Sequence, residues 1–190
     1  MSKLIKVYRR FVASTRAVAA VEFGMILPIL LIMLLASIDA GRAIAIYMKV
    51  RASAYTVDAV TNQYSVIHDS DMQQILGASA VVLSPYSSTP LKIIVSQLSI
   101  SSGGQATASW SDALNATARA VGSSVVVPST LTGNTPPNNI CSSFPCYVIL
   151  GEVSYSYTPM FGYFITGPIT LADTVYVTPR SVTSITRSSP

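Results

Sequence analysis

The stretch AVAAVEFGMILPILLIMLLASI, residues 17–38, decides the architecture of this chain because it is apolar except for one charge, Glu22. A helix of roughly 20 apolar residues can cross the hydrocarbon core of a membrane. The sequence therefore predicts a transmembrane helix over residues 18–40. A carboxylate inside such a helix costs about 2.5–3.5 kcal/mol on insertion scales, so we expect Glu22 to have a function and a partner.

Basic residues orient the predicted helix. Five bases and no acid precede it: Lys3, Lys6, Arg9, Arg10 and Arg16. This excess favours a cytoplasmic N-terminus and places residues 41–190 outside the cytoplasm. The formal net charge of +4 comes from this leader, because residues 18–190 hold seven bases and eight acids. A nucleic-acid-binding domain would carry a basic stripe on its fold, so we expect no nucleic-acid partner.

A second apolar pattern follows the span. No Gly or Pro occurs from Arg42 to Leu76, and seven positions recur at alternating steps of four and three residues. They are Ile46, Val50, Ser53, Val57, Val60, Tyr64 and Ile67. This repeat predicts that the helix continues and buries one face. We favour burial on the chain's own head over a coiled coil.

The rest of the sequence predicts a small head with four strands. Leu91–Ile100 and Ala106–Trp110 flank a turn at Gly103-Gly104 and read as a hairpin. Tyr147–Tyr157 and Leu171–Thr178 form a second pair, joined by a loop rich in Gly and aromatic residues. The predicted fold class is α+β, a long N-terminal helix packed on a small, mainly antiparallel sheet.

Two further helices are expected in the head. Ser70-Asp71-Met72-Gln73 matches a capping box that opens a short helix to about Leu76. We prefer this interpretation to a metal cluster at His68-Asp-Ser-Asp71. Residues 112–121 are expected to form another helix.

The two cysteines lie at the end of a segment, Pro128–Cys146, that is a loop by composition. Cys141 and Cys146 are separated by four residues in a region expected outside the cytoplasm, where disulfides persist. We predict a disulfide between them, worth about 2 kcal/mol for so small a loop. The alternative, a redox or metal pair, lacks the usual two-residue spacing and further Cys or His ligands.

Catalytic chemistry has little support in this sequence. One His, eight acids and no Gly-rich phosphate loop leave no convincing nucleophile and base. We therefore predict no enzyme, and no catalytic residue, metal or cofactor.

The basic leader is followed by Ala17, Val21-Glu22-Phe23, Leu27-Pro28 and Gly41-Arg42. With these residues the N-terminal region resembles the class III signal of type IV pilins, and most closely the TadE-like minor pseudopilins of the tight-adherence (Tad, Flp or type IVb) pilus. Ala17 stands where the family usually has Gly. Weaker similarity at residues 153–159 and 177–180 looks like the closing strands of a pilin-like head.

The resemblance implies a processing site at Ala17, Val18, Glu22 and Phe23. In such families a prepilin peptidase cuts on the cytoplasmic side after the small residue, which would remove residues 1–17 and create an amine on Val18. That amine is expected to pair with Glu22 of a neighbouring subunit, which fixes axial register more than it adds stability. The alternative is that Glu22 only reaches to the cytoplasmic interface.

The function implied by the resemblance is that of a minor pseudopilin in the assembly or initiation of a Tad pilus for surface adhesion. The implied partners are the prepilin peptidase, other pilins and pseudopilins, the inner-membrane assembly platform and the membrane. The protein would cross the inner membrane once, with a periplasmic head, and could enter the surface pilus. Two alternatives stay open: a secretion-system pseudopilin, and an extracytoplasmic binding domain, anchored or released at the formal signal-peptidase site Ala43-Ile-Ala45.

Overall fold

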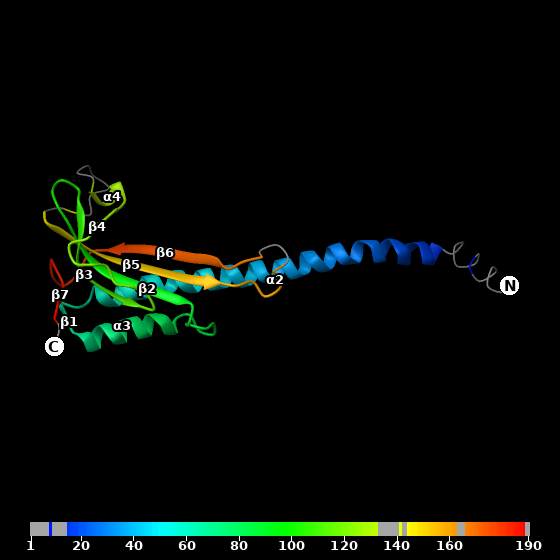
Figure 1. Ribbon diagram of the computed structural model, residues 1–190, viewed down its shortest axis with the longest axis horizontal. Helices are drawn as coiled ribbons and strands as arrows, with labels where there is room; N and C mark the ends of the chain where they lie inside the picture. Colours follow the sequence, from blue (N-terminus) through cyan, green and yellow to red (C-terminus); the bar gives the residue numbers. More distant parts are fainter. Residues whose placement is uncertain (1–7, 9–14, 133–140, 142–143, 163–165, 189–190) are drawn as a thin grey trace. The chain divides into compact units, whose positions relative to one another are not determined.

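The computed structural model describes residues 8, 15–132, 141, 144–162 and 166–188 (Figure 1). The chain divides into two compact units. The first comprises Met1–Ala43 and Thr158–Gly167, and the second comprises Ile44–Tyr157 and Pro168–Pro190. The long helix α2 (Thr15–Thr61) contributes to both units and contains Pro28.

The second unit contains a five-stranded antiparallel sheet with the strand order β4-β3-β2-β5-β6. The strands are β2 (Leu91–Ile100), β3 (Ala106–Leu114), β4 (Ser124–Val125), β5 (Cys146–Tyr157) and β6 (Ile169–Val177). The α+β prediction and its four strands are confirmed, although β3 runs four residues further than predicted and β4 was not foreseen.

Two helices cover one face of this sheet, namely the C-terminal half of α2 and α3 (Asp69–Val81) (Figure 1). The Ser53 hydroxyl of α2 donates to the Ser79 carbonyl of α3 at 2.7 Å. The side chains buried from these two helices include Ile46, Val50, Val57, Met72, Ile75 and Leu76. This layer is the main core of the second unit.

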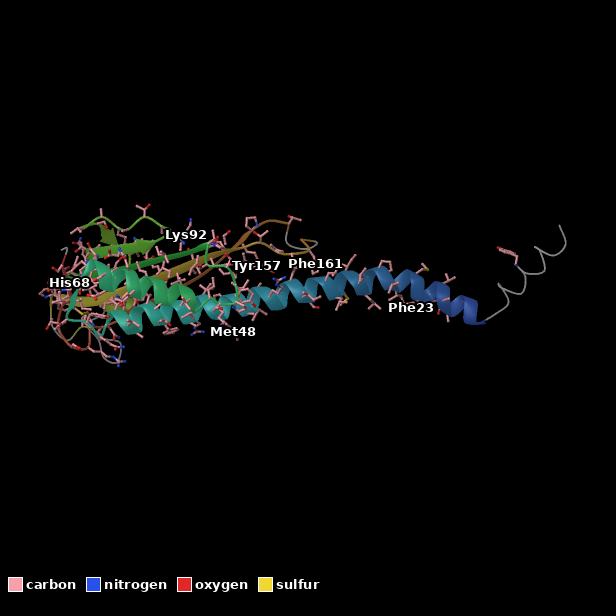
Figure 2. All side chains as sticks on the ribbon, turned by 90° about the horizontal axis from the view of Figure 1, so that it is seen from below. Phe23, Met48, His68, Lys92, Tyr157 and Phe161 are labelled. Atoms are coloured by element: carbon pink, nitrogen blue, oxygen red, sulfur yellow. A yellow bond between two sulfur atoms is a disulfide. The ribbon has the colours of Figure 1, made fainter. Side chains whose placement is uncertain are left out.

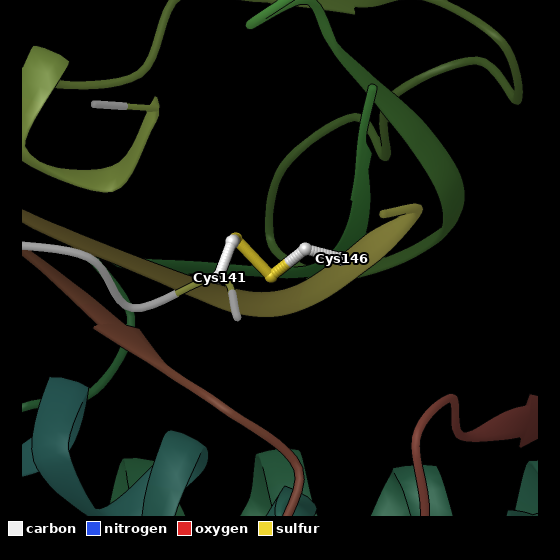
Figure 3. The surroundings of a disulfide bond; sticks show 2 residues. All are labelled: Cys141 and Cys146. Atoms are coloured by element: carbon white, nitrogen blue, oxygen red, sulfur yellow. A yellow bond between two sulfur atoms is a disulfide. The ribbon is translucent and has the colours of Figure 1, made fainter. Parts of the chain in front are cut away.

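A second apolar cluster lies at one end of the sheet. Leu98, Val148 and Leu150 pack there with Leu131 of the short helix α4 (Ser129–Thr132). Both cysteines belong to this cluster, and the predicted disulfide between Cys141 and Cys146 is confirmed (Figure 3). The bond ties the end of the loop to the first residue of β5.

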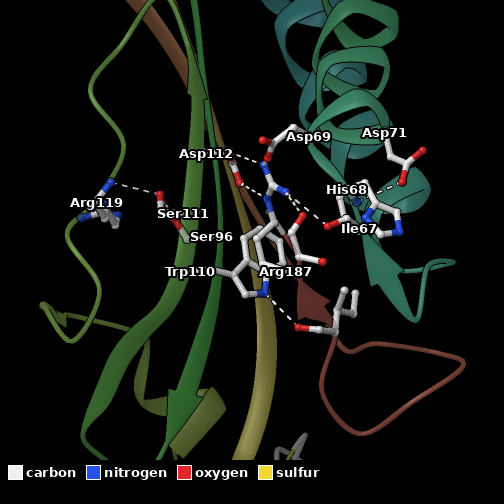
Figure 4. Close-up of polar contacts among 12 residues, drawn as sticks. Ile67, His68, Asp69, Asp71, Ser96, Trp110, Ser111, Asp112, Arg119 and Arg187 are labelled. Carbon is white, nitrogen blue, oxygen red and sulfur yellow. Dashed lines mark hydrogen bonds and ion pairs between the residues drawn. The ribbon is translucent and has the colours of Figure 1, made fainter. Parts of the chain in front are cut away.

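The C-terminal segment is fixed to the sheet by polar side chains (Figure 4). Strand β7 (Thr186–Arg187) pairs in parallel with β1 (Val66–Ile67). Arg187 donates two hydrogen bonds to the Asp112 carboxylate, at 2.8 and 3.1 Å, and forms an ion pair with Asp69. The Trp110 indole N–H donates to the Ile185 carbonyl at 3.0 Å.

The predicted seven-residue repeat is correct only in its first part. Ile46, Val50, Ser53 and Val57 are buried, but Val60 is only half-buried. Since α2 ends at Thr61, the last two predicted positions, Tyr64 and Ile67, lie outside the helix. A straight helix drifts away from a strict seven-residue repeat, so the buried face passes to Asp58 and Thr61 instead.

The predicted helix over residues 112–121 is wrong. Strand β3 extends into this region and ends at Leu114, which pairs with Ile93 of β2. Asn115 then turns the chain with a positive φ of 54° and donates from its side-chain amide to the Leu91 carbonyl at 2.9 Å. Pairing with β2 outweighs the helix propensity of the alanines that follow.

The predicted helix near Ser70 exists with different ends. Helix α3 is preceded by His68 as its N-cap, and the Asp71 carboxylate accepts the His68 backbone N–H at 3.0 Å. The helix continues to Val81 instead of ending near Leu76. It is longer because Ser79 is still buried against α2, so tertiary packing supports the extra turn.

Candidate functional site

The N-terminal half of α2 exposes an apolar surface. Its most apolar window of 18 residues has a mean hydropathy of 2.5, and none of it is buried. The exposed side chains include Phe23, Met25, Ile29, Leu31, Met33 and Leu34. By length and composition this helix can cross a membrane. An apolar surface of this extent suggests membrane anchoring, because soluble monomers rarely expose one.

The structure places the predicted processing residues on this exposed helix. Ala17 lies within the helical backbone, and Val18 and Glu22 follow with exposed side chains one turn apart. Phe23 is also exposed (Figure 2). In the described part of the chain, Glu22 forms no hydrogen bond or ion pair. The described residues of this chain therefore supply no partner for its carboxylate in this conformation.

Asp39 forms a polar contact that the sequence analysis missed. This acid lies after the apolar span and is only 7% exposed. Its carboxylate accepts the backbone N–H groups of Met160, Phe161 and Gly162 at 3.0, 3.2 and 3.4 Å. The loop that follows β5 is thus held against α2 within the first unit. An acid directly after an apolar span was the available signal, but its loop partner is 121 positions away.

Asp58 is the second acid that the sequence analysis assigned no role. It is fully buried, and neither carboxylate oxygen has a hydrogen-bond partner in the described part of the chain. Burial raises the pKa of Asp58 to about 8. The carboxyl group is therefore largely protonated near neutral pH.

Gly151 explains how Asp58 fits beneath the sheet. A Cβ atom at this position of β5 would overlap the Asp58 carboxylate and touch Val57. The absence of a side chain thus lets α2 approach the central strands. Two neighbouring polar atoms, Thr61 Oγ1 and Asn62 Oδ1, are also buried without a hydrogen-bond partner in the described residues.

The opposite face of the sheet carries a small open pocket. Its lining includes Lys92, Ala116, Glu152 and Ser154. Beside it, the Arg119 guanidinium donates to both Glu152 oxygens, at 2.7 and 2.6 Å. The two side chains are about a third exposed, so this pair contributes little to stability.

The residues of the rejected metal interpretation serve the fold. Asp71 caps α3, and Asp69 pairs with Arg187. No group of three or more His, Cys, Asp or Glu side chains gathers as a metal site in the residues that the structure describes. These acids are therefore structural.

A family model, that of the TadE-like protein family, matches residues 17–57. No curated protein and no solved structure matches the chain. The matched segment covers the exposed half of α2, including Glu22, and part of the buried half. Proteins of this family are structural components of pili, and their partners are the membrane and other pilus proteins. The predicted resemblance is confirmed: this chain carries a TadE-like segment at residues 17–57, which supports involvement in a Tad pilus system.

Proposed function

We propose that this chain is a minor pseudopilin that assembles or initiates a Tad (Flp, type IVb) pilus involved in surface adhesion. It crosses the inner membrane once, with a cytoplasmic N-terminus and a periplasmic head. The observation that carries the proposal is the position of Glu22. This carboxylate lies inside the TadE-like segment, on the N-terminal half of α2, whose apolar side chains are exposed.

The proposed mechanism begins with removal of residues 1–17 by a prepilin peptidase. Cleavage after Ala17 creates an amine on Val18, which is cationic near neutral pH. Val18 and Glu22 are one helical turn apart, about 6 Å along the axis. Two mature helices packed side by side with an offset of about one turn bring the amine of one to the carboxylate of the other. The contact replaces two costly charges by one pair and fixes the axial register.

Processing can be tested directly. N-terminal sequencing or intact-mass analysis of the protein from native membranes should give a mature chain that begins at Val18. Ala17→Gly should preserve cleavage, whereas Ala17→Phe should block it because the site takes a small residue. A chain that begins at Ile46, after Ala45, would contradict the proposal and support conventional secretion.

The pilus role can be tested in a deletion strain. Loss of the gene should remove most surface pili, and the wild-type gene should restore them. Normal pilus numbers together with the loss of a secreted protein would instead identify a secretion pseudopilin.

A further inference from the structure

The loop after β5 and the apolar half of α2 belong to one compact unit. Two apolar side chains of this loop are uncovered, since Met160 is 62% exposed and Phe161 is 38% exposed. Ile38, at the end of the apolar span, is exposed as well. The apolar surface of the helix thus continues onto the loop.

The distance along the helix from Val18 to this loop matches the thickness of the hydrocarbon core of a membrane. At 1.5 Å per residue, the 21 steps from Val18 to Asp39 span about 32 Å. The hydrocarbon core of a bilayer is about 30 Å thick. When Val18 lies at one boundary of that core, Asp39 and the loop bound to it lie at the other.

The backbone N–H groups at residues 160–162 of the loop are paired, as approach to lipid requires. Unpaired N–H groups are very costly near hydrocarbon, where no water replaces a missing partner. Asp39 accepts three successive N–H groups, those of residues 160–162. Gly162 has a positive φ of 63°, which lets these N–H groups converge on one carboxylate.

A basic side chain lies at the same level. The Arg42 guanidinium is 3.2 Å from the Met160 sulfur, to which it donates. A guanidinium beside exposed apolar groups is suited to the boundary between anionic headgroups and acyl chains.

We propose that Met160 and Phe161 insert into the headgroup–acyl boundary of the bilayer at the end of the span opposite Val18, and that Asp39 holds them at that depth. The inference rests on the membrane-spanning helix of the proposed function. Its partner is the lipid surface of the periplasmic leaflet. The contact fixes how far the helix can slide through the membrane.

Quenching by spin-labelled lipid tests this depth. Met160→Cys is labelled with a fluorophore in the full-length protein, whose native cysteines are bridged and do not react. The protein is reconstituted into phosphatidylethanolamine–phosphatidylglycerol vesicles that carry a spin label near the headgroup or deep in the acyl chain. The label at position 160 should be quenched strongly by the shallow spin label and weakly by the deep one.

Two control positions separate this inference from the membrane anchor itself. Leu30→Cys, within the span, should be quenched best by the deep spin label, and Val126→Cys, which is 96% exposed in the second unit, by neither. Quenching at position 30 but not at position 160 would overturn the loop contact alone. Absence of quenching at both would overturn the membrane anchor as well.

A substitution of Asp39, which holds the loop, adds a second readout. Asp39→Asn in the Met160→Cys background keeps the shape but weakens acceptance of three N–H groups, because a neutral amide is a poorer acceptor than a carboxylate. Shallow quenching at position 160 should fall while deep quenching at position 30 stays the same. Unchanged quenching at position 160 would contradict the role of Asp39.

Discussion

The two halves of α2 meet opposite surroundings. Before Ala43 the side chains of Phe23, Leu31 and Met33 are exposed. After Ala43 the same helix buries Val50 and Val57 against a sheet of its own chain. Both halves are helical, but Lys49, Arg51 and Asp58 interrupt the second half, which therefore buries only one face.

One acid in each half of α2 shows the same difference in surroundings. Glu22 is exposed on the uncovered half, whereas Asp58 is buried on the covered half beneath Gly151. A buried acid with no hydrogen-bond partner destabilises the head when it ionises. An acid on an uncovered apolar helix becomes costly only when lipid or another helix surrounds it. We therefore propose that Glu22 acts between molecules, whereas Asp58 lies within the fold of one.

Glycine substitutions at Gly24, in the uncovered half of α2, and at Gly151, in the strand β5 that faces the covered half, should differ most in effect. Gly151→Ala places a methyl group into the Asp58 carboxylate and should destabilise the head by about 1–3 kcal/mol. Gly24→Ala meets nothing within 4 Å in the isolated chain and should leave the stability of the head unchanged. Chemical denaturation of the detergent-solubilised protein measures both. Equal stability of the two variants would show that α2 does not pack closely on β5.

The buried acid should make the stability of the head depend on pH. The pKa of Asp58 is about 8 in the fold, against an ordinary value of 3.8, so the folded state binds more protons between these values. The contribution of Asp58 to the stability of the head is thus largest below about pH 4. It falls as the pH rises to about 8, by at most about 1.4 kcal/mol for each pH unit.

Asp58→Asn should remove most of this loss, because an amide does not ionise. Melting temperatures at pH 5 and pH 8 provide the measurement. The control is Asp173→Asn, which changes an acid with a partly exposed side chain and should keep the pH dependence. An equal loss between pH 5 and pH 8 in Asp58→Asn and the wild type would contradict the assignment.

Two arginines allow a smaller comparison within the head. Arg187 is 16% exposed and contacts Asp112 and Asp69, so Arg187→Met leaves two carboxylates without their cation and should cost about 2 kcal/mol. Arg51 is 58% exposed and lies 3.8 Å from Asp173, so Arg51→Met should change the stability little or not at all. Urea denaturation gives both values, and a larger loss in Arg51→Met would reverse the ranking.

The disulfide should have the smallest effect on the main core. Reduction of the bond between Cys141 and Cys146 removes a short link, worth about 2 kcal/mol, at the edge of the second apolar cluster. The helices on the other face do not contact it, so circular dichroism should retain the folded signal after reduction. Complete unfolding in mild reductant would show that the cluster supports the whole sheet.

The sequence predicted those elements whose pattern is local. Alternation marked the strands at Leu91–Ile100 and Tyr147–Tyr157, and an unbroken apolar run marked α2. The predicted helix over residues 112–121 failed because a strand partner, and not the local sequence, decides the conformation of Asp112–Leu114. Local propensity carries no information on that partner.

The candidate site was predictable only in part. Glu22 stood out because it is the single charge in an apolar span. Asp39 and Asp58 did not, since the first depends on a loop 121 positions away and the second on the missing side chain of Gly151. Such long-range contacts require the fold.

The central claim is that Glu22 acts between subunits and is not needed for removal of the leader. Glu22→Gln keeps the shape of the side chain but removes the charge that would match the Val18 amine. Glu22→Val also removes it and should behave similarly. Ala17→Phe is the matched control, because it should fail at cleavage itself.

The decisive measurement is the number of pili per cell by electron microscopy, read beside an immunoblot for leader removal in the Glu22→Gln strain. The account predicts normal cleavage with few or no pili. Normal cleavage with normal pilus numbers would contradict it, and would show that Glu22 is an interfacial residue and that helix packing alone sets the register.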